Sequence, residues 1–208
     1  PYVRGRQKSR SSKAVLAECH QLVERGVKEI TLLGQNVNSY GQDKTGDATS
    51  FAELLRQVAG IAGLERLRFT TSHPKDIAND VIAAFADLDK LCPQLHLPLQ
   101  AGSDRVLGAM GRKYDSARYR DIVSRLRQAR PDIALSTDLI VGFPGETEED
   151  FQETLALMQE VGFASSFSFQ YCDRPGVRAE GMEGKVEDAV KAERLQRLQA
   201  LQETLTQQ

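Results

Sequence analysis

The sequence predicts an α/β protein built as a partial parallel barrel of the TIM type. Segments with the pattern of a strand alternate with segments whose apolar residues recur at helical spacing, which indicates parallel strands joined by right-handed crossovers. Several strands run out into polar or glycine-rich ends, at residues 34–36, 71–73, 100–103 and 142–146. Functional residues in a barrel lie at the carboxyl ends of many strands, whereas an open doubly wound sheet gathers its ligand at one switch point. The pattern therefore favours the barrel.

The first half of the chain shows the alternation clearly. Serines precede the first helical segment and Gly26 follows it, as is usual at helix ends. The predicted elements are a helix over Ser12 to Arg25, a strand over Glu29 to Val37, a helix over about Ser50 to Gly60, a strand over Arg66 to Ser72 and a helix over Ile77 to Phe85. Because the chain begins with a loop and a helix, we expect the first strand of the barrel, ahead of Pro1, to be missing.

The second half continues the alternation and brings the expected strands to five, too few to close a barrel. Thr147 and Asp150 have the spacing of a capping box at the start of a helix. The remaining predicted elements are strands over Leu95 to Gln100, Ala134 to Val141 and Ser165 to Tyr171, and helices over Asp104 to Met110, about Tyr119 to Ala129, from Thr147 onward and over Glu187 to Leu205.

Composition limits the classes of function. The 208 residues are 40% hydrophobic and 27% charged, which suits one sizeable core. A net charge of -2 argues against capture of nucleic acid by the whole surface, so an RNA contact must depend on a local patch such as the basic segment with Arg4 and Arg6. No apolar stretch approaches the roughly 20 residues that span a bilayer, and no signal-peptide pattern stands at the start. We expect a cytoplasmic protein without membrane contact.

The cysteines and histidines do not form a metal-ligand pattern. Cys19, Cys92 and Cys172 lie far apart in the sequence, so we expect buried free thiols, although Cys172 follows a strand and could face a cavity. His73 lies at a strand end without a second ligand at suitable spacing, which favours a capped turn over a zinc site. His96 lies in an apolar strand and is expected in the core, and His20 is expected to be solvated.

The stretch VGFPGETEEDF, at residues 141–151, is the most specific local motif. Gly142 and Gly145 let a backbone approach a ligand closely, and the following helix N-terminus can receive an anion or a hydroxyl-rich group. Well-capped loops of purely structural role have the same appearance, and so does the strand end LLGQN. No residue pair has the pattern of an acid–base or nucleophilic catalyst, and so no catalytic residue is assigned. The residues alone indicate a ligand-binding partial barrel, with chemistry supplied by a cofactor.

Six motifs occur in the order PYVRGR, LLGQNVNSY, RFTTSHP, LHLPLQAGSDRVLGAMGR, DLIVGFPGETEEDF and YCDRPG. In this order the chain resembles the radical S-adenosylmethionine methylthiotransferases, and GQNVNSY resembles their tRNA-modifying branch. The resemblance implies a partial barrel of the radical S-adenosylmethionine type and addition of a methylthio group to C2 of N6-isopentenyladenosine beside the anticodon. In that family PYVRG directly follows three cysteines that bind a 4Fe-4S cluster.

The resemblance also assigns parts, cofactors and partners. It implies that residues 1–208 are a truncated core, without the N-terminal methylthiotransferase domain, the cluster loop and the C-terminal RNA-binding domain, and are inactive alone. The full-length enzyme would use S-adenosylmethionine and two 4Fe-4S clusters, with no cluster on this chain, a tRNA anticodon loop as substrate and an electron donor such as flavodoxin. The implied cofactor-binding residues are Gly34, Gln35, Asn36, Gln100, Ser103, Arg112, Gly142, Phe143 and Gly145, and Arg4, Arg6 and Arg174 are implied on the substrate side.

Two alternatives stay open. A cluster-free barrel that binds RNA or a protein partner has the same scaffold, and a sister methylthiotransferase could act on threonylcarbamoyladenosine or on a ribosomal protein. The sequence departs from the family pattern at Ala101, Cys172 and Val177, where Ser, Ser and Thr are usual. These changes affect only local hydrogen bonds.

Overall fold

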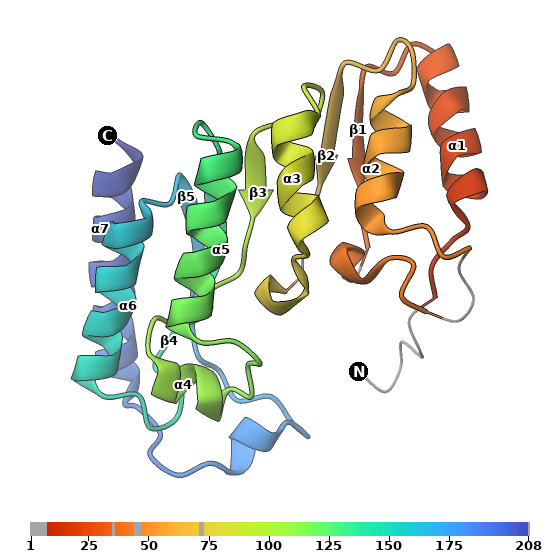
Figure 1. The fold of residues 1–208 in the computed structure, drawn as a ribbon. Coiled ribbons are helices and arrows are strands. Elements are labelled where there is room, and N and C mark those ends of the chain that lie inside the picture. Colours follow the sequence, from red (N-terminus) through yellow and green to blue (C-terminus); the bar gives the residue numbers. More distant parts are fainter. Residues whose placement is uncertain (1–7, 35, 44–46, 71–72, 208) are drawn as a thin grey trace. The chain divides into compact units, whose positions relative to one another are not determined.

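A computed structural model describes residues 8–34, 36–43, 47–70 and 73–207 of the chain (Figure 1). The chain divides into two compact units. The first comprises Pro1–Leu95 and Arg125–Ile133, and the second comprises His96–Ser124 and Ala134–Gln208. The boundary passes through one strand and one helix, so each unit contains parts of the chain that are distant in sequence. Among the helices of the described ranges, none has both the length and the apolar character needed to cross a membrane.

The first unit is a two-stranded parallel sheet with helices packed beside it. β1 and β2 pair in parallel from Glu29 with Arg66 to Leu32 with Phe69. Phe69 lies in the core between Phe51, whose ring centroid is 5.0 Å away, and Phe85 at 5.7 Å. The elements are α1 (Ser12–Glu24), β1 (Glu29–Leu32), η1 (Val37–Ser39), α2 (Phe51–Ala59), β2 (Arg66–Phe69), η2 (Pro74–Asp76) and α3 (Asn79–Asp87).

The second unit is organised around a long central strand. β4 pairs in parallel with β5, from Ser136 with Ser165 to Val141 with Gln170, and β3 lies on the other side of β4. Helix α7 packs against β5 and α6. The elements that lie wholly or partly in this unit are β3 (Gln94–His96), α4 (Asp104–Ala109), α5 (Ser116–Ala129), β4 (Ala134–Val141), α6 (Glu148–Val161), β5 (Ser165–Gln170), η3 (Arg178–Gly181) and α7 (Asp188–Thr206), of which β3 and α5 cross the boundary between the units.

The predicted order of helices and strands is confirmed, and the described residues contain the five expected strands in two sheets without a closed barrel. Four strands end before their predicted limits: β1 at Leu32, β2 at Phe69, β3 at His96 and β5 at Gln170, and Thr71 and Ser72 of the second predicted strand lie outside the described residues. β1 ends at Leu32 because the chain turns into η1, where the Asn36 side chain bonds the Ser39 hydroxyl. β3 ends at His96 because Pro98 has no N–H and the Leu99 N–H donates to the side chain of Thr137 instead of to the β4 backbone.

Some of the predictions for single residues need correction. Cys19 is buried as expected, and burial raises the pKa of its thiol, but Cys92 is half-buried and Cys172 is exposed. His96 is not a core residue: it is partly exposed, with its Nδ1 3.0 Å from the Ser136 hydroxyl. The capped turn at His73 is confirmed, since its Nδ1 accepts the Lys75 N–H at 3.3 Å.

Candidate cofactor site

The loop that follows β4, residues 142–146, has a conformation that depends on glycine. Gly142 and Gly145 have φ of 73° and 81°, in the left-handed region that side chains rarely adopt. A Cβ atom added to Gly142 would also overlap the side chain of Lys191 on α7. The Gly142 N–H donates to Glu146 Oε1 at 2.9 Å, which closes the loop on itself. Phe143 is buried, with its ring centroid 5.2 Å from that of Tyr171.

A buried ion pair fixes this loop from α7. Arg194 Nη1 donates to Glu146 Oε1 at 2.8 Å and to the Glu146 carbonyl at 3.2 Å. Only 6% of the Arg194 side chain and 2% of the Glu146 side chain are exposed. Burial raises the pKa of the Glu146 carboxyl, and the Gly142 N–H and the Arg194 guanidinium offset only part of this effect. The loop is therefore held by groups that are themselves buried.

Asp150 joins the helix that follows the loop to the start of α4. It forms the predicted capping box with Thr147 and accepts a hydrogen bond from the Ser103 hydroxyl at 2.6 Å and another from Arg105 Nε at 3.2 Å. Burial alone would raise the pKa of Asp150, but the hydrogen bonds from Arg105, Ser103 and Thr147 outweigh it and hold the pKa well below its usual range. The Ser103 proton is thus committed to Asp150, and only the oxygen lone pairs remain for a ligand.

Gln100 holds a strained backbone conformation beside the same strand. Its φ is 72°, which is uncommon for a residue with a side chain, and its side chain is largely buried. Its N–H donates to the Asp138 carbonyl at 2.8 Å, and its carbonyl accepts the Ile140 N–H at 2.9 Å. Such strain persists only where the surroundings enforce it, and it is frequent at ligand sites.

Arg112 and Arg174 are the predicted cationic members of the site in the second unit. Arg112 follows α4 and is half-buried, whereas Arg174 follows β5 and is exposed. Neither guanidinium forms an ion pair with a residue that the structure describes, in contrast to Arg105 and Arg194. Both are therefore available to an anionic ligand. Because Arg112 is already half-buried, binding a ligand there would remove less water from its guanidinium than binding at Arg174 would.

In the first unit, the end of β1 contains an acceptor without a donor. Asn36 Nδ2 donates to Ser39 Oγ at 2.8 Å and to Asp76 Oδ2 at 2.7 Å. Asn36 Oδ1 is buried and receives no hydrogen bond from the residues that the structure describes. Gly34 precedes it and is exposed. Buried polar atoms are nearly always paired, so this carbonyl oxygen points to a missing donor. Gln35, Arg4 and Arg6 lie outside the described residues.

Asp76 belongs to this strand end, although no sequence motif predicted it. It ends η2, in the segment that follows β2, and the carboxyl ends of the parallel strands β1 and β2 meet at one edge of their sheet. Burial would raise its pKa, but hydrogen bonds from Lys75 and Asn36 outweigh burial and lower it. The carboxylate therefore stays ionised and orients Asn36. The feature of the sequence that could have predicted its role is its place in the polar loop that follows a strand.

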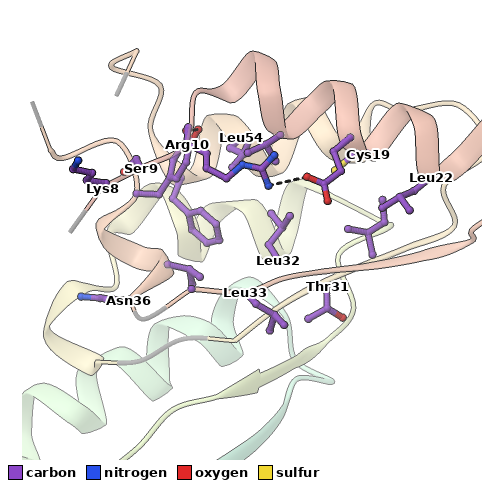
Figure 2. Close-up of a pocket in the computed structure, with 17 residues that line it drawn as sticks. Lys8, Ser9, Arg10, Cys19, Leu22, Thr31, Leu32, Leu33, Asn36 and Leu54 are labelled. Carbon is purple, nitrogen blue, oxygen red and sulfur yellow. Dashed lines mark hydrogen bonds and ion pairs between the residues drawn. The ribbon is translucent and has the colours of Figure 1, made fainter. Parts of the chain in front are cut away.

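A cavity of about 810 Å³ adjoins this strand end in the first unit (Figure 2). Residues of α1, β1 and α2 line it, together with Gly34 and Asn36. The ion pair between Arg10 and Glu18, 2.7 Å long, lies at its border and is the dashed line in Figure 2. The cavity joins apolar side chains such as Leu32 to polar groups at the strand end, a combination typical of small-molecule sites. In the described part of the chain, no three His, Cys, Asp or Glu side chains are grouped to hold a metal ion.

Comparison with known proteins identifies the family and the fold. The model of the Radical SAM superfamily matches residues 1–158, and the chain belongs to that superfamily. Coproporphyrinogen III oxidase from Escherichia coli, a radical SAM enzyme, has a similar fold, with a TM-score of 0.62 at 16% identity over 93% of this chain and 46% of that one. Methylornithine synthase superposes with a TM-score of 0.57 at 14% identity, covering 91% of this chain and 53% of the other. The predicted fold class is confirmed.

Curated relatives share much more sequence with this chain than the solved structures do. The tRNA-2-methylthio-N(6)-dimethylallyladenosine synthase of Nitratidesulfovibrio vulgaris strain DP4 is 64% identical over 207 residues, which are 100% of this chain and 46% of that protein. The protein of the same name from Oleidesulfovibrio alaskensis is 66% identical over 202 residues, 97% of this chain and 44% of the relative. The resemblance to tRNA-modifying methylthiotransferases is thus confirmed, and the chain spans somewhat less than half the length of these relatives.

Proposed function

We propose that this chain is the S-adenosylmethionine-binding core of a tRNA methylthiotransferase that adds a methylthio group to C2 of N6-dimethylallyladenosine next to the anticodon. The observation that carries the proposal is the identity of 64–66% with proteins of that name over essentially the whole chain. S-adenosylmethionine at a reduced 4Fe-4S cluster supplies a radical that attacks unreactive C–H bonds. The complete enzyme would use two such clusters.

The residues present fit this cofactor. The buried acceptor Asn36 Oδ1 suits an ammonium or hydroxyl donor of the ligand. Arg112, with no ion-pair partner in the described ranges, suits a carboxylate. The N–H groups of Gly142 and Gly145 already donate within the protein, to Glu146 Oε1 and to the Gly184 carbonyl, so the loop formed by Gly142, Phe143 and Gly145 would contribute a preformed surface near the adenine. This chain therefore contributes binding and orientation to the reaction.

The remaining assignments complete the proposal. Gly34, Gln35 and Asn36 would contact the methionyl part of the cofactor, and Gln100 and Ser103 its ribose or carboxylate. Arg4, Arg6 and Arg174 would face the substrate. The tRNA anticodon loop would be the substrate and a flavodoxin-like protein the electron donor, in the cytoplasm. We further propose that the chain alone, without the rest of the enzyme, is inactive.

Anaerobic turnover tests the activity. The full-length enzyme, reconstituted with iron and sulfide, is incubated with S-adenosylmethionine, reductant and an anticodon stem-loop that carries N6-dimethylallyladenosine. Mass spectrometry of the digested RNA should show the 2-methylthio nucleoside, and the chain of 208 residues should give none under the same conditions. Failure on this hairpin together with turnover of a hairpin that carries threonylcarbamoyladenosine, or of a ribosomal protein, would contradict the proposed substrate.

A further inference from the structure

One face of the sheet in the second unit presents aromatic rings to solvent. Phe167 and Phe169 on β5 are 59% and 54% exposed, although large apolar side chains are usually buried. The register pairs Phe167 with Asp138 and Phe169 with Ile140 on β4. Side chains two residues apart lie on the same face of a sheet, so both rings share one face with Asp138 and Ile140.

A polar pair lies beside these rings. His96 Nε2 is 3.4 Å from Asp138 Oδ2, and His96 Nδ1 is 3.0 Å from the Ser136 hydroxyl. The His96 ring stands edge-on to that of Phe167, at a centroid distance of 6.1 Å and an angle of 67°. The side chain of Asp138 is 33% exposed, and no described residue donates a hydrogen bond to its Oδ1. A carboxylate oxygen that can accept a hydrogen bond therefore lies next to exposed aromatic rings.

The exposed rings and the neighbouring carboxylate together favour one kind of ligand for this face of the sheet. A purely apolar surface, from a second copy or another protein, would cover the rings but would leave Asp138 Oδ1 desolvated without a donor, which is costly. A nucleobase has a π-face for the rings and N–H groups for the carboxylate. Bases within a duplex are already stacked, so a base from a single-stranded loop is the matching ligand.

We propose that the face formed by Phe167, Phe169, Asp138 and His96 binds the adenine base of a single-stranded RNA loop. Phe167 and Phe169 supply the stacking surface, and Asp138, oriented by His96, accepts the N–H of the exocyclic amine. This inference rests on the proposed function and names the part of the chain that would recognise the substrate base. Stacking of a base on an aromatic side chain contributes about 1–3 kcal/mol.

The test measures binding of RNA hairpins to the full-length enzyme in the absence of S-adenosylmethionine. One labelled hairpin carries N6-dimethylallyladenosine at the target position, and a second is identical except for an abasic site there. We expect Phe167→Leu and Phe169→Leu each to raise the Kd of the first hairpin by about 5- to 100-fold and to leave the Kd of the abasic hairpin unchanged. Phe167→Trp should retain wild-type binding, because it keeps a ring to stack on.

Ser168→Ala provides the matched control, since Ser168 lies between the two phenylalanines and points to the opposite face of β5. It should bind both hairpins as the wild type does. Equal losses on both hairpins, or wild-type binding by the leucine variants, would overturn the inference. So would a loss of S-adenosylmethionine affinity with unchanged hairpin binding, which would assign the face to the adenine of the cofactor. Failure of the wild-type enzyme to modify any tRNA hairpin would instead count against the proposed function.

Discussion

The ends of β4 and β1 differ in which polar atom the described residues leave without a hydrogen bond: the donor Arg194 Nε, which lies 3.5 Å from Glu148 Oε2, and the acceptor Asn36 Oδ1. After β4, the Gly142 N–H, the Glu146 carboxylate and the Arg194 guanidinium bond one another within the protein. After β1, Asn36 Oδ1 is buried without a donor among the described residues. The first arrangement fixes a backbone conformation before any ligand binds, whereas the second leaves an acceptor for which a ligand can supply the donor. Variants of the β4 loop should therefore change folding stability most, and variants at Asn36 should change ligand affinity most.

Replacing Arg194 is expected to have the largest effect. Arg194→Met leaves the Glu146 carboxylate buried without its cation, and such losses typically cost about 3–5 kcal/mol. Urea unfolding monitored by circular dichroism measures this change. Arg197→Met is the control on the same helix: its guanidinium bonds Glu148 at 2.6 Å but is 35% exposed, so its loss should cost less than about 1 kcal/mol. Equal losses for the two variants would show that the buried pair does not hold the loop.

Gly142→Ala should have the next largest effect, about 1–3 kcal/mol, because alanine must adopt a φ of 73° and displace the side chain of Lys191. The double variant with Lys191→Ala should recover the stability lost to the steric overlap but not the stability lost to backbone strain. The matched control is Gly108→Ala in α4, where a Cβ meets no atom within 4 Å. That change should stabilise the protein by about 0.5–1 kcal/mol. Destabilisation by both substitutions would contradict the specific role of Gly142.

Asn36→Ala tests the other region. We expect its unfolding free energy to fall by about 1–2 kcal/mol, since two side-chain hydrogen bonds, to Ser39 and Asp76, are lost. Its Kd for S-adenosylmethionine, measured by calorimetry on the full-length enzyme, should rise about tenfold, the equivalent of one further hydrogen bond of about 1.4 kcal/mol. Ser39→Ala removes one of the same hydrogen bonds without removing Oδ1 and should leave that Kd nearly unchanged. An equal rise for both variants would assign the effect to folding.

The sequence predicted the elements well where the signal is local. The alternation of strands and helices and the capping box of Thr147 with Asp150 depend on neighbouring residues, and both are confirmed. The pair of Arg194 with Glu146 joins residues 48 positions apart, on a helix and a loop, and has no periodic signature. His96 was expected in the core because its neighbours are apolar. Its exposure depends on which face of the sheet is left uncovered, and a single strand does not encode that.

The smallest effect expected is a pair of opposite pH dependences in the second unit. The pKa of Asp150 lies below its ordinary value in the folded protein, because hydrogen bonds from Arg105, Ser103 and Thr147 outweigh burial. Its stabilising contribution is therefore complete above the unfolded pKa of about 3.9 and is lost as the pH falls towards the folded pKa. The pKa of Glu146 is raised by burial. The folded state then holds that proton more tightly than the unfolded state, and stability declines as the pH rises from about 4.3 to the folded pKa.

Unfolding free energies measured at a series of pH values separate the two carboxyls, since the slope reports the difference in bound protons between the unfolded and folded states. Asp150→Asn should remove much of the loss of stability on acidification below about pH 4. Glu146→Gln should remove the decline in unfolding free energy that occurs as the pH rises above about 4.3. The glutamine keeps an acceptor for the Gly142 N–H. Asp121→Asn on α5, whose carboxylate is exposed, should follow the wild-type curve. If Asp150→Asn also followed it, the hydrogen bonds at the helix start would not be the source of acid sensitivity, and the contrast with Asn36 would rest on Arg194 and Glu146 alone.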